Sequence, residues 1–178
     1  EPQRTGFLWL PDIETAIPGM AFTRSQDFRT AFPINDLHKR IFAVQAAAWR
    51  TSLTNTALII WQKNRWDMLS PTEQPLPGGA AVEVLMMRNE HRAAAFNISH
   101  CGAMPAALRL SITGLPGGPS PAFVTVHDAP FTDTKSGVPV MAALPMARRD
   151  GGNYLIEIDP GMTRQVWLDF DTQGLAAG

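Results

Sequence analysis

Residues 86–97 read MMRNEHRAAAFN, and the fold depends on whether this stretch bends back on itself. Beyond the polar run RNEHR, apolar residues recur at every second position and so share one face of an extended strand: Ala94, Phe96 and Ile98. Asn89 is a favourable turn residue, and Glu90 can accept hydrogen bonds from nearby backbone N–H groups. We therefore predict a hairpin between AVEVLMMR and RAAAFNIS, with a structural turn at Arg88, Asn89 and Glu90.

The same polar run also admits a catalytic interpretation. Glu90 beside His91, flanked by two arginines, has the composition of an acid–base cluster, which would need a cleft and a perturbed pKa. The turn is favoured because the run falls where two alternating patterns meet. A small glycoside hydrolase using acids near Glu90 and Asp67 is kept as an alternative, and it would require two carboxylates facing one cleft.

Further strands are predicted downstream of this stretch. Their segments alternate in polarity and are rich in branched and aromatic residues: ALRLSIT, FVTVHD, VPVMAAL, NYLIEID and RQVWLDF. Glycine, proline, asparagine and aspartate between them favour tight turns. No helical segment separates the later strands, which disfavours a parallel sheet. The pattern predicts a mainly β fold, with an antiparallel immunoglobulin-like β-sandwich as the domain at residues 72–178.

Upstream of the predicted strands, the pattern is helical. Apolar residues recur at helical spacing: Leu37, Ile41, Val44 and Ala48. With Asn35 as the N-cap, we expect an amphipathic helix over residues 36–53. It belongs to an N-terminal irregular or helical segment, residues 1–71, that packs on the sandwich. TALIIWQ then predicts a strand, and continuation of the helix to Met68 is the competing interpretation. Another short strand is expected at residues 7–10.

Composition argues against several kinds of site and partner. The 178 residues include 15 basic and 16 acidic side chains, so the net charge of −1 does not suggest nucleic-acid binding. No apolar run is long enough to span a membrane. One cysteine, Cys101, excludes an intrachain disulfide and a thiolate-rich zinc site. The histidines lack ligand spacing, and no phosphate loop or Gly-x-Ser-x-Gly motif occurs, so we expect no metal, no cofactor and no catalytic residue.

Tryptophan is the residue type that most suggests ligand contact. The chain has five tryptophans and a single tyrosine. An exposed pair of tryptophans on a β-sandwich can stack on sugar rings, because the large rigid rings lose little side-chain entropy. The candidate carbohydrate-binding residues combine three rings with polar neighbours: Trp61, Trp66, Trp167, Gln62, Asn64 and Asp67. The competing interpretation is that these rings pack the helix or a neighbouring domain against the sandwich.

Several segments, taken in order, resemble one type of bacterial domain. RNEHRAAAFNIS is similar to its "RNE" strand pair, and LRLSITGLPG to the strand that follows. VHDAPFTDTKSGVPVMAALPMA and IDPGMTRQVWLDFD resemble two later segments, with AALP where the family often has Asp-Ala-Leu. From about residue 82 to residue 178, the chain therefore resembles the β-sandwich domain that precedes the barrel in uncharacterised bacterial glycoside-hydrolase-like proteins.

The resemblance implies a function for the domain. None of the matching positions is catalytic in the family pattern. The expected role is that of a non-catalytic accessory module of an extracytoplasmic carbohydrate-active protein, periplasmic or secreted. Its partners would be a catalytic barrel, expected beyond Gly178, and a polysaccharide. A self-standing carbohydrate-binding module and a small glycoside hydrolase are the alternatives.

Overall fold

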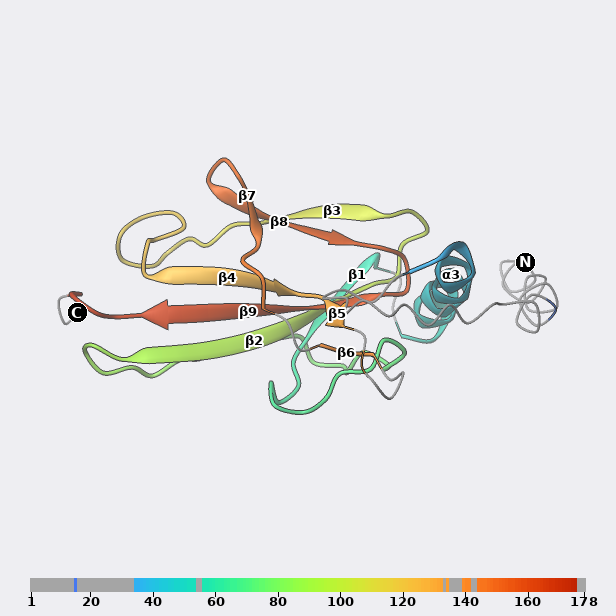
Figure 1. The fold of residues 1–178 in the computed structure, drawn as a ribbon, viewed down its shortest axis with the longest axis horizontal. Coiled ribbons are helices and arrows are strands. Elements are labelled where there is room, and N and C mark those ends of the chain that lie inside the picture. Colours follow the sequence, from blue (N-terminus) through green and yellow to red (C-terminus); the bar gives the residue numbers. More distant parts are fainter. Residues whose placement is uncertain are drawn as a thin grey trace.

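The computed structural model describes residues 34–53, 56–132, 139–141 and 144–175, together with Thr15 and Thr134. The strand expected at residues 7–10 lies outside the described residues. The described residues are mainly β, as predicted, with the strands in antiparallel sheets (Figure 1). The strands are β1 (Leu58–Trp61), β2 (His91–His100), β3 (Ala106–Leu110), β4 (Val124–Ala129), β5 (Phe131–Thr132), β6 (Val140–Met141), β7 (Arg148–Asp150), β8 (Asn153–Ile158) and β9 (Thr163–Asp171).

Two larger sheets share one hydrophobic core. The four-stranded sheet has the order β1-β2-β9-β4 and the three-stranded sheet the order β3-β8-β7, while β5 and β6 form a separate pair. The core contains residues of both larger sheets, among them Ile98 and Val166 from the first and Tyr154 and Ile156 from the second. The two sheets therefore pack against each other, and the inward positions are those that the period-two pattern predicted.

The predicted helix is confirmed as α3, Asp36–Ser52. Asn35 caps it: the Asn35 side chain accepts a hydrogen bond from the His38 N–H (2.9 Å), and the Asn35 N–H donates to His38 Nδ1 (3.3 Å). Phe42 packs into a second core cluster with Phe131, Ile158 and Met162. The amide of Gln45 donates to the Gly161 carbonyl (2.7 Å), so α3 is fixed to the turn between β8 and β9.

Strand β1 settles the interpretation of TALIIWQ. Its residues pair with residues 97–100 of β2, so helical continuation to Met68 is wrong. Because β1 lies inside residues 1–71, that segment contributes an edge strand to the sheet. The first arm of the predicted hairpin is a further correction, since residues 80–87 join no sheet and Leu85 is 94% exposed.

The turn contacts explain why this arm stays unpaired. The Met87 N–H donates to the Glu90 carboxylate (2.8 Å), and the Met87 carbonyl accepts from Thr172 Oγ1 (2.9 Å). Glu90 pairs its own backbone with Thr172, beyond the end of β9. The backbone groups that would begin a ladder between the two arms are therefore satisfied elsewhere.

Gly161 tests the attachment of the helix. It has φ +70°, and a Cβ there would overlap the carbonyl of Phe42. Gly151 has φ +62° with open space around it, so it serves as a matched control. We expect G151A to cost about 1 kcal/mol from backbone strain and G161A about 3 kcal/mol or more, measured by urea unfolding. Equal losses would show that the helix does not pack closely on this turn.

Candidate functional site

The turn at Arg88 and Asn89 is a structural feature of the chain. Asn89 adopts φ 57°, a left-handed conformation that asparagine tolerates well. One Glu90 carboxylate oxygen accepts from the Met87 N–H, and the other lies 2.5 Å from Arg92 Nη2. These two contacts hold the pKa of Glu90 below its ordinary value, the backbone hydrogen bond contributing most. A general acid needs a raised pKa, so this environment favours a structural carboxylate.

A polar groove of about 610 Å³ lies beside the N-terminal half of β2. Its lining comes from residues 92–95 of β2, residues 62–65 after β1 and residues 83–85 of the unpaired arm. In the described part of the chain, β1 pairs only with residues 97–100, so the edge of β2 is open at this point. The Gln62 amide donates to the Ala95 carbonyl there (3.3 Å).

The polar side chains that line the groove are chiefly basic and amide groups, and the apolar lining residues come from β2 and the unpaired arm. Lys63 is held by Glu73 (2.6 Å), while Arg92 contacts Glu90. Arg65 differs, because its Nε is buried without a hydrogen-bond partner among the described residues. Glu83 is the one carboxylate among the described lining residues. The paired carboxylates that a glycosidase uses are therefore not brought together in this groove.

Trp66 and Trp167 form an aromatic pair next to the groove. Their ring centroids are 5.7 Å apart and their planes meet at 72°, an edge-to-face contact. The Arg65 guanidinium lies over the Trp66 ring, 5.3 Å from its centroid. Trp167 Nε1 donates to Gln165 Oε1 (2.7 Å), which fixes the second ring. Trp66 is 74% exposed, so its ring is held in place and still open to solvent.

The sequence candidates occupy different places. Gln62 and Asn64 line the groove, and Asn64 Oδ1 accepts from the Trp66 N–H (3.1 Å), which helps to position that ring. Asp67 is exposed in the same turn and its N–H donates to the Asn64 carbonyl (3.0 Å). Trp61 is fully buried, and its Nε1 donates to Ser99 Oγ (2.9 Å). A ring in that position offers no face to a ligand, so the expectation of a Trp61 platform is wrong.

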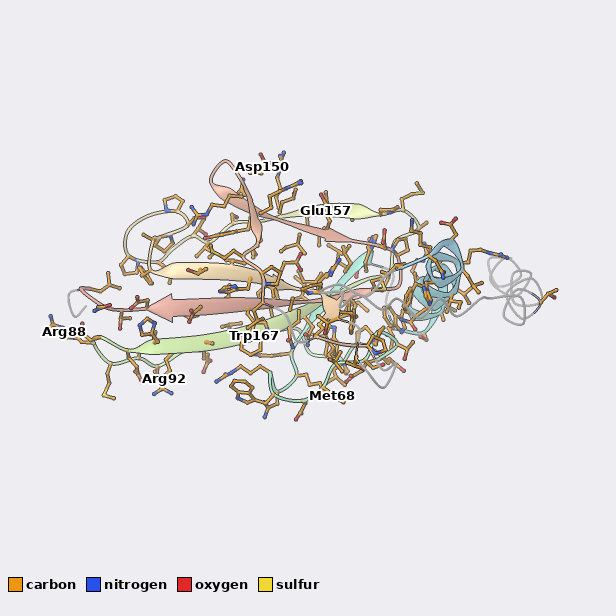
Figure 2. The ribbon with its side chains drawn as sticks, in the orientation of Figure 1. Met68, Arg88, Arg92, Asp150, Glu157 and Trp167 are labelled. Atoms are coloured by element: carbon orange, nitrogen blue, oxygen red, sulfur yellow. The ribbon has the colours of Figure 1, made fainter. Side chains whose placement is uncertain are left out.

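Two contributors were missed from the sequence. Arg65 carries the cation over Trp66, and its position directly before that ring in QKNRW was the available signal. The small residues 93–95 leave the backbone of β2 accessible, and their run of three alanines was the signal. Trp167 of β9 and Met68 of the loop after β1 lie on the opposite side of the molecule from Asp150 and Glu157 of the three-stranded sheet (Figure 2).

Other titratable groups lie apart from the groove. Burial lowers the pKa of His100, and burial raises the pKa of the Cys101 thiol. Burial also raises the pKa of Asp128, with Arg164 opposing that shift. No group of three or more His, Cys, Asp or Glu that could hold a metal ion occurs within the described ranges. No helix of those ranges is long and apolar enough to cross a membrane.

Comparison with known proteins gives no family assignment. No protein-family model matches the sequence, and no curated protein matches it.

Glu90 provides a test of the turn. Because its pKa is lowered in the folded protein, its ionised form stabilises the fold at pH values above the unfolded-state pKa. That stabilisation disappears as the pH falls through the lowered folded-state value. We expect E90Q to be less stable than the wild type at about pH 7 and the difference to be smaller at about pH 3, measured by urea unfolding.

Glu83 supplies the control for this experiment. It belongs to the same unpaired arm but takes no part in the turn contacts, so E83Q should match the wild type at both pH values. A stability difference for E90Q that persists unchanged in acid would contradict the ionised turn carboxylate.

Proposed function

We propose that the chain is a non-catalytic accessory module of an extracytoplasmic carbohydrate-active protein, with an immunoglobulin-like sandwich fold. In this proposal the module contributes a glycan-binding surface centred on Trp66 and Trp167. The order of the segments RNEHRAAAFNIS, LRLSITGLPG and IDPGMTRQVWLDFD supports the accessory role by resemblance. The accessory role rests on the likeness of the whole domain to others, whereas the binding surface rests on the contacts of Trp66 and Trp167.

The observation that carries the binding function is the exposed ring of Trp66, which is contacted by Trp167 and Arg65. Trp167 contacts its ring and Arg65 lies over it, so little further conformational entropy is lost when a ligand stacks there. Leaving the large apolar ring of Trp66 in contact with water does not stabilise the isolated domain, so the exposed ring suggests a binding role. A sugar ring, which has apolar C–H faces and polar edges, suits such a ring with polar groups beside it.

The neighbouring groove supplies the polar groups. Gln62 and Asn64 carry amides that both donate and accept, and Arg65 offers guanidinium donors. Amide and guanidinium groups suit the hydroxyl groups of sugars, which need both kinds of partner. Because the rings meet at 72°, a ligand would stack on one ring and contact the edge of the other.

Docking on a neighbouring domain is the second candidate function. Several large apolar side chains are strongly exposed in the segments around the groove, which is the usual sign of a contact surface: Met68, Leu85 and Met87. Leu85 also lines the groove, so the two candidate functions share one surface.

Trp66→Ala tests the glycan-binding function. Soluble β-glucan, xylan, galactomannan and polygalacturonate are the probes, with affinity electrophoresis as the measurement. We expect W66A to weaken binding to the recognised polysaccharide about tenfold, because the stacking face is lost. Met104 is equally exposed, at 74%, and lies in the loop between β2 and β3, so M104A is the matched control.

The outcomes decide whether the glycan-binding function holds. Retention of the wild type by one polysaccharide, lost in W66A and kept in M104A, supports the glycan site. No retention by any of the four polysaccharides, or equal retention of W66A and the wild type, would contradict it.

A further inference from the structure

The strand register places the Trp pair at one end of a longer row of side chains, in which Trp167 and His127 are half-buried and Trp66 and Met146 are exposed. Trp167 of β9 is directly opposite Ala95 of β2 on one side and His127 of β4 on the other. His127 is in turn bridged to Met146, which follows the described residues of β6 and lies before β7. Directly opposed residues in a sheet point to the same face. Trp167, His127 and Met146 are therefore neighbours on one surface.

This surface is the outer face of the four-stranded sheet. Val166, Leu168 and Val126 alternate with Trp167 and His127 and belong to or pack on the core shared with the three-stranded sheet. Trp167 and His127 consequently point away from that core. Trp66 joins the row from the β2 side, because its loop is tied to Ala95 through Gln62. We call Trp66, Trp167, His127 and Met146 the cross-strand stripe.

The stripe is long and open at its far end. Neighbouring strands are about 4.8 Å apart, so the distance from Trp167 through His127 to Met146 is about 10 Å. The Trp66 ring adds 5.7 Å between centroids at the other end. Met146 is 69% exposed, so the surface continues to solvent beyond β4. A single terminal sugar would cover only a part of this length.

His127 is positioned to take part in hydrogen bonding. Its Nδ1 donates to the Leu144 carbonyl (3.0 Å), and in the neutral ring this leaves Nε2 as an acceptor. The row next to the stripe contains Asp169 and Thr125, which are directly opposed to each other on the same face. The apolar and aromatic row is thus flanked by acceptors and a hydroxyl, the combination that sugar hydroxyl groups require.

We propose that the ligand is a polysaccharide chain bound across the strands, along the cross-strand stripe, rather than a terminal sugar. Trp66 and Trp167 contact the first sugar units, and His127 and Met146 contact units further along the same chain. This inference rests on the proposed glycan-binding function and assigns a role to two residues outside the Trp pair.

The test is the dependence of affinity on the length of the ligand. Two-unit and six-unit β-1,4-linked oligosaccharides of glucose, xylose and mannose are the probes, with titration calorimetry as the measurement. We expect the wild type to bind the six-unit form of one sugar about tenfold more tightly than the two-unit form. H127A and M146A should each lower the six-unit affinity about threefold or more and leave the two-unit affinity unchanged. Circular dichroism melting confirms that each variant is folded.

The controls distinguish the failure of this inference from the failure of the proposed function. M104A removes an exposed methionine away from the stripe and should keep the full gain in affinity with length. Equal affinities for two and six units, or a gain with length that survives in H127A and M146A, would overturn the stripe while leaving the Trp66 site intact. Absence of binding to every oligosaccharide would overturn the stripe, and absence of retention by all four polysaccharides would overturn the glycan-binding function as well.

Discussion

The antiparallel pairing of β2 with β9 is the constraint on which the rest of the structure depends. It joins residues 91–99 to residues 163–171 without interruption, and β1 and β4 flank this pair. Backbone hydrogen bonds at His100 and at Glu90 close the two ends of the pair and fix which residues are opposed to each other. A shift of β9 by one residue against β2 would turn Val166 out of the core and Trp167 into it.

Side-chain hydrogen bonds hold both ends of this ladder. At one end Thr172 bonds to the backbone of Met87 and Glu90, which closes the turn before β2. At the other end the hydroxyl oxygens of Ser99 and Thr163 are 2.6 Å apart, and the Trp61 indole N–H donates to the Ser99 hydroxyl. Buried hydroxyls are favourable only with such partners, so this cluster also favours a single register. This single register places the cross-strand stripe on the outer face of the four-stranded sheet.

Local patterns were sufficient to predict most of the fold. Period-two alternation identified β3, β8 and β9, and Asn35 with the helical spacing identified α3, because these signals depend on neighbours in the sequence. The fate of residues 80–87 was not predictable in this way. Their alternation is that of a strand, but partners far along the chain, Thr172 above all, satisfy the turn that would have paired them.

The candidate site was only partly predictable for the same reason. Trp61 and Trp66 look equivalent in the sequence, yet the Trp61 ring is fully buried and the Trp66 ring is exposed. Which ring is buried depends on the packing of the loop after β1, which no local pattern records. His127 and Met146 gave no signal, because they adjoin Trp167 only through long-range register.

The register of β2 against β9 can be measured directly in solution. Ala95 and Trp167 form a pair that exchanges no backbone hydrogen bonds, in which the two Cα atoms approach to about 4.5 Å. We expect strong nuclear Overhauser contacts between the Hα atoms of Ala95 and Trp167, and between those of Ala93 and Asp169. Contacts displaced by one residue, or helical contacts across residues 88–92, would contradict it.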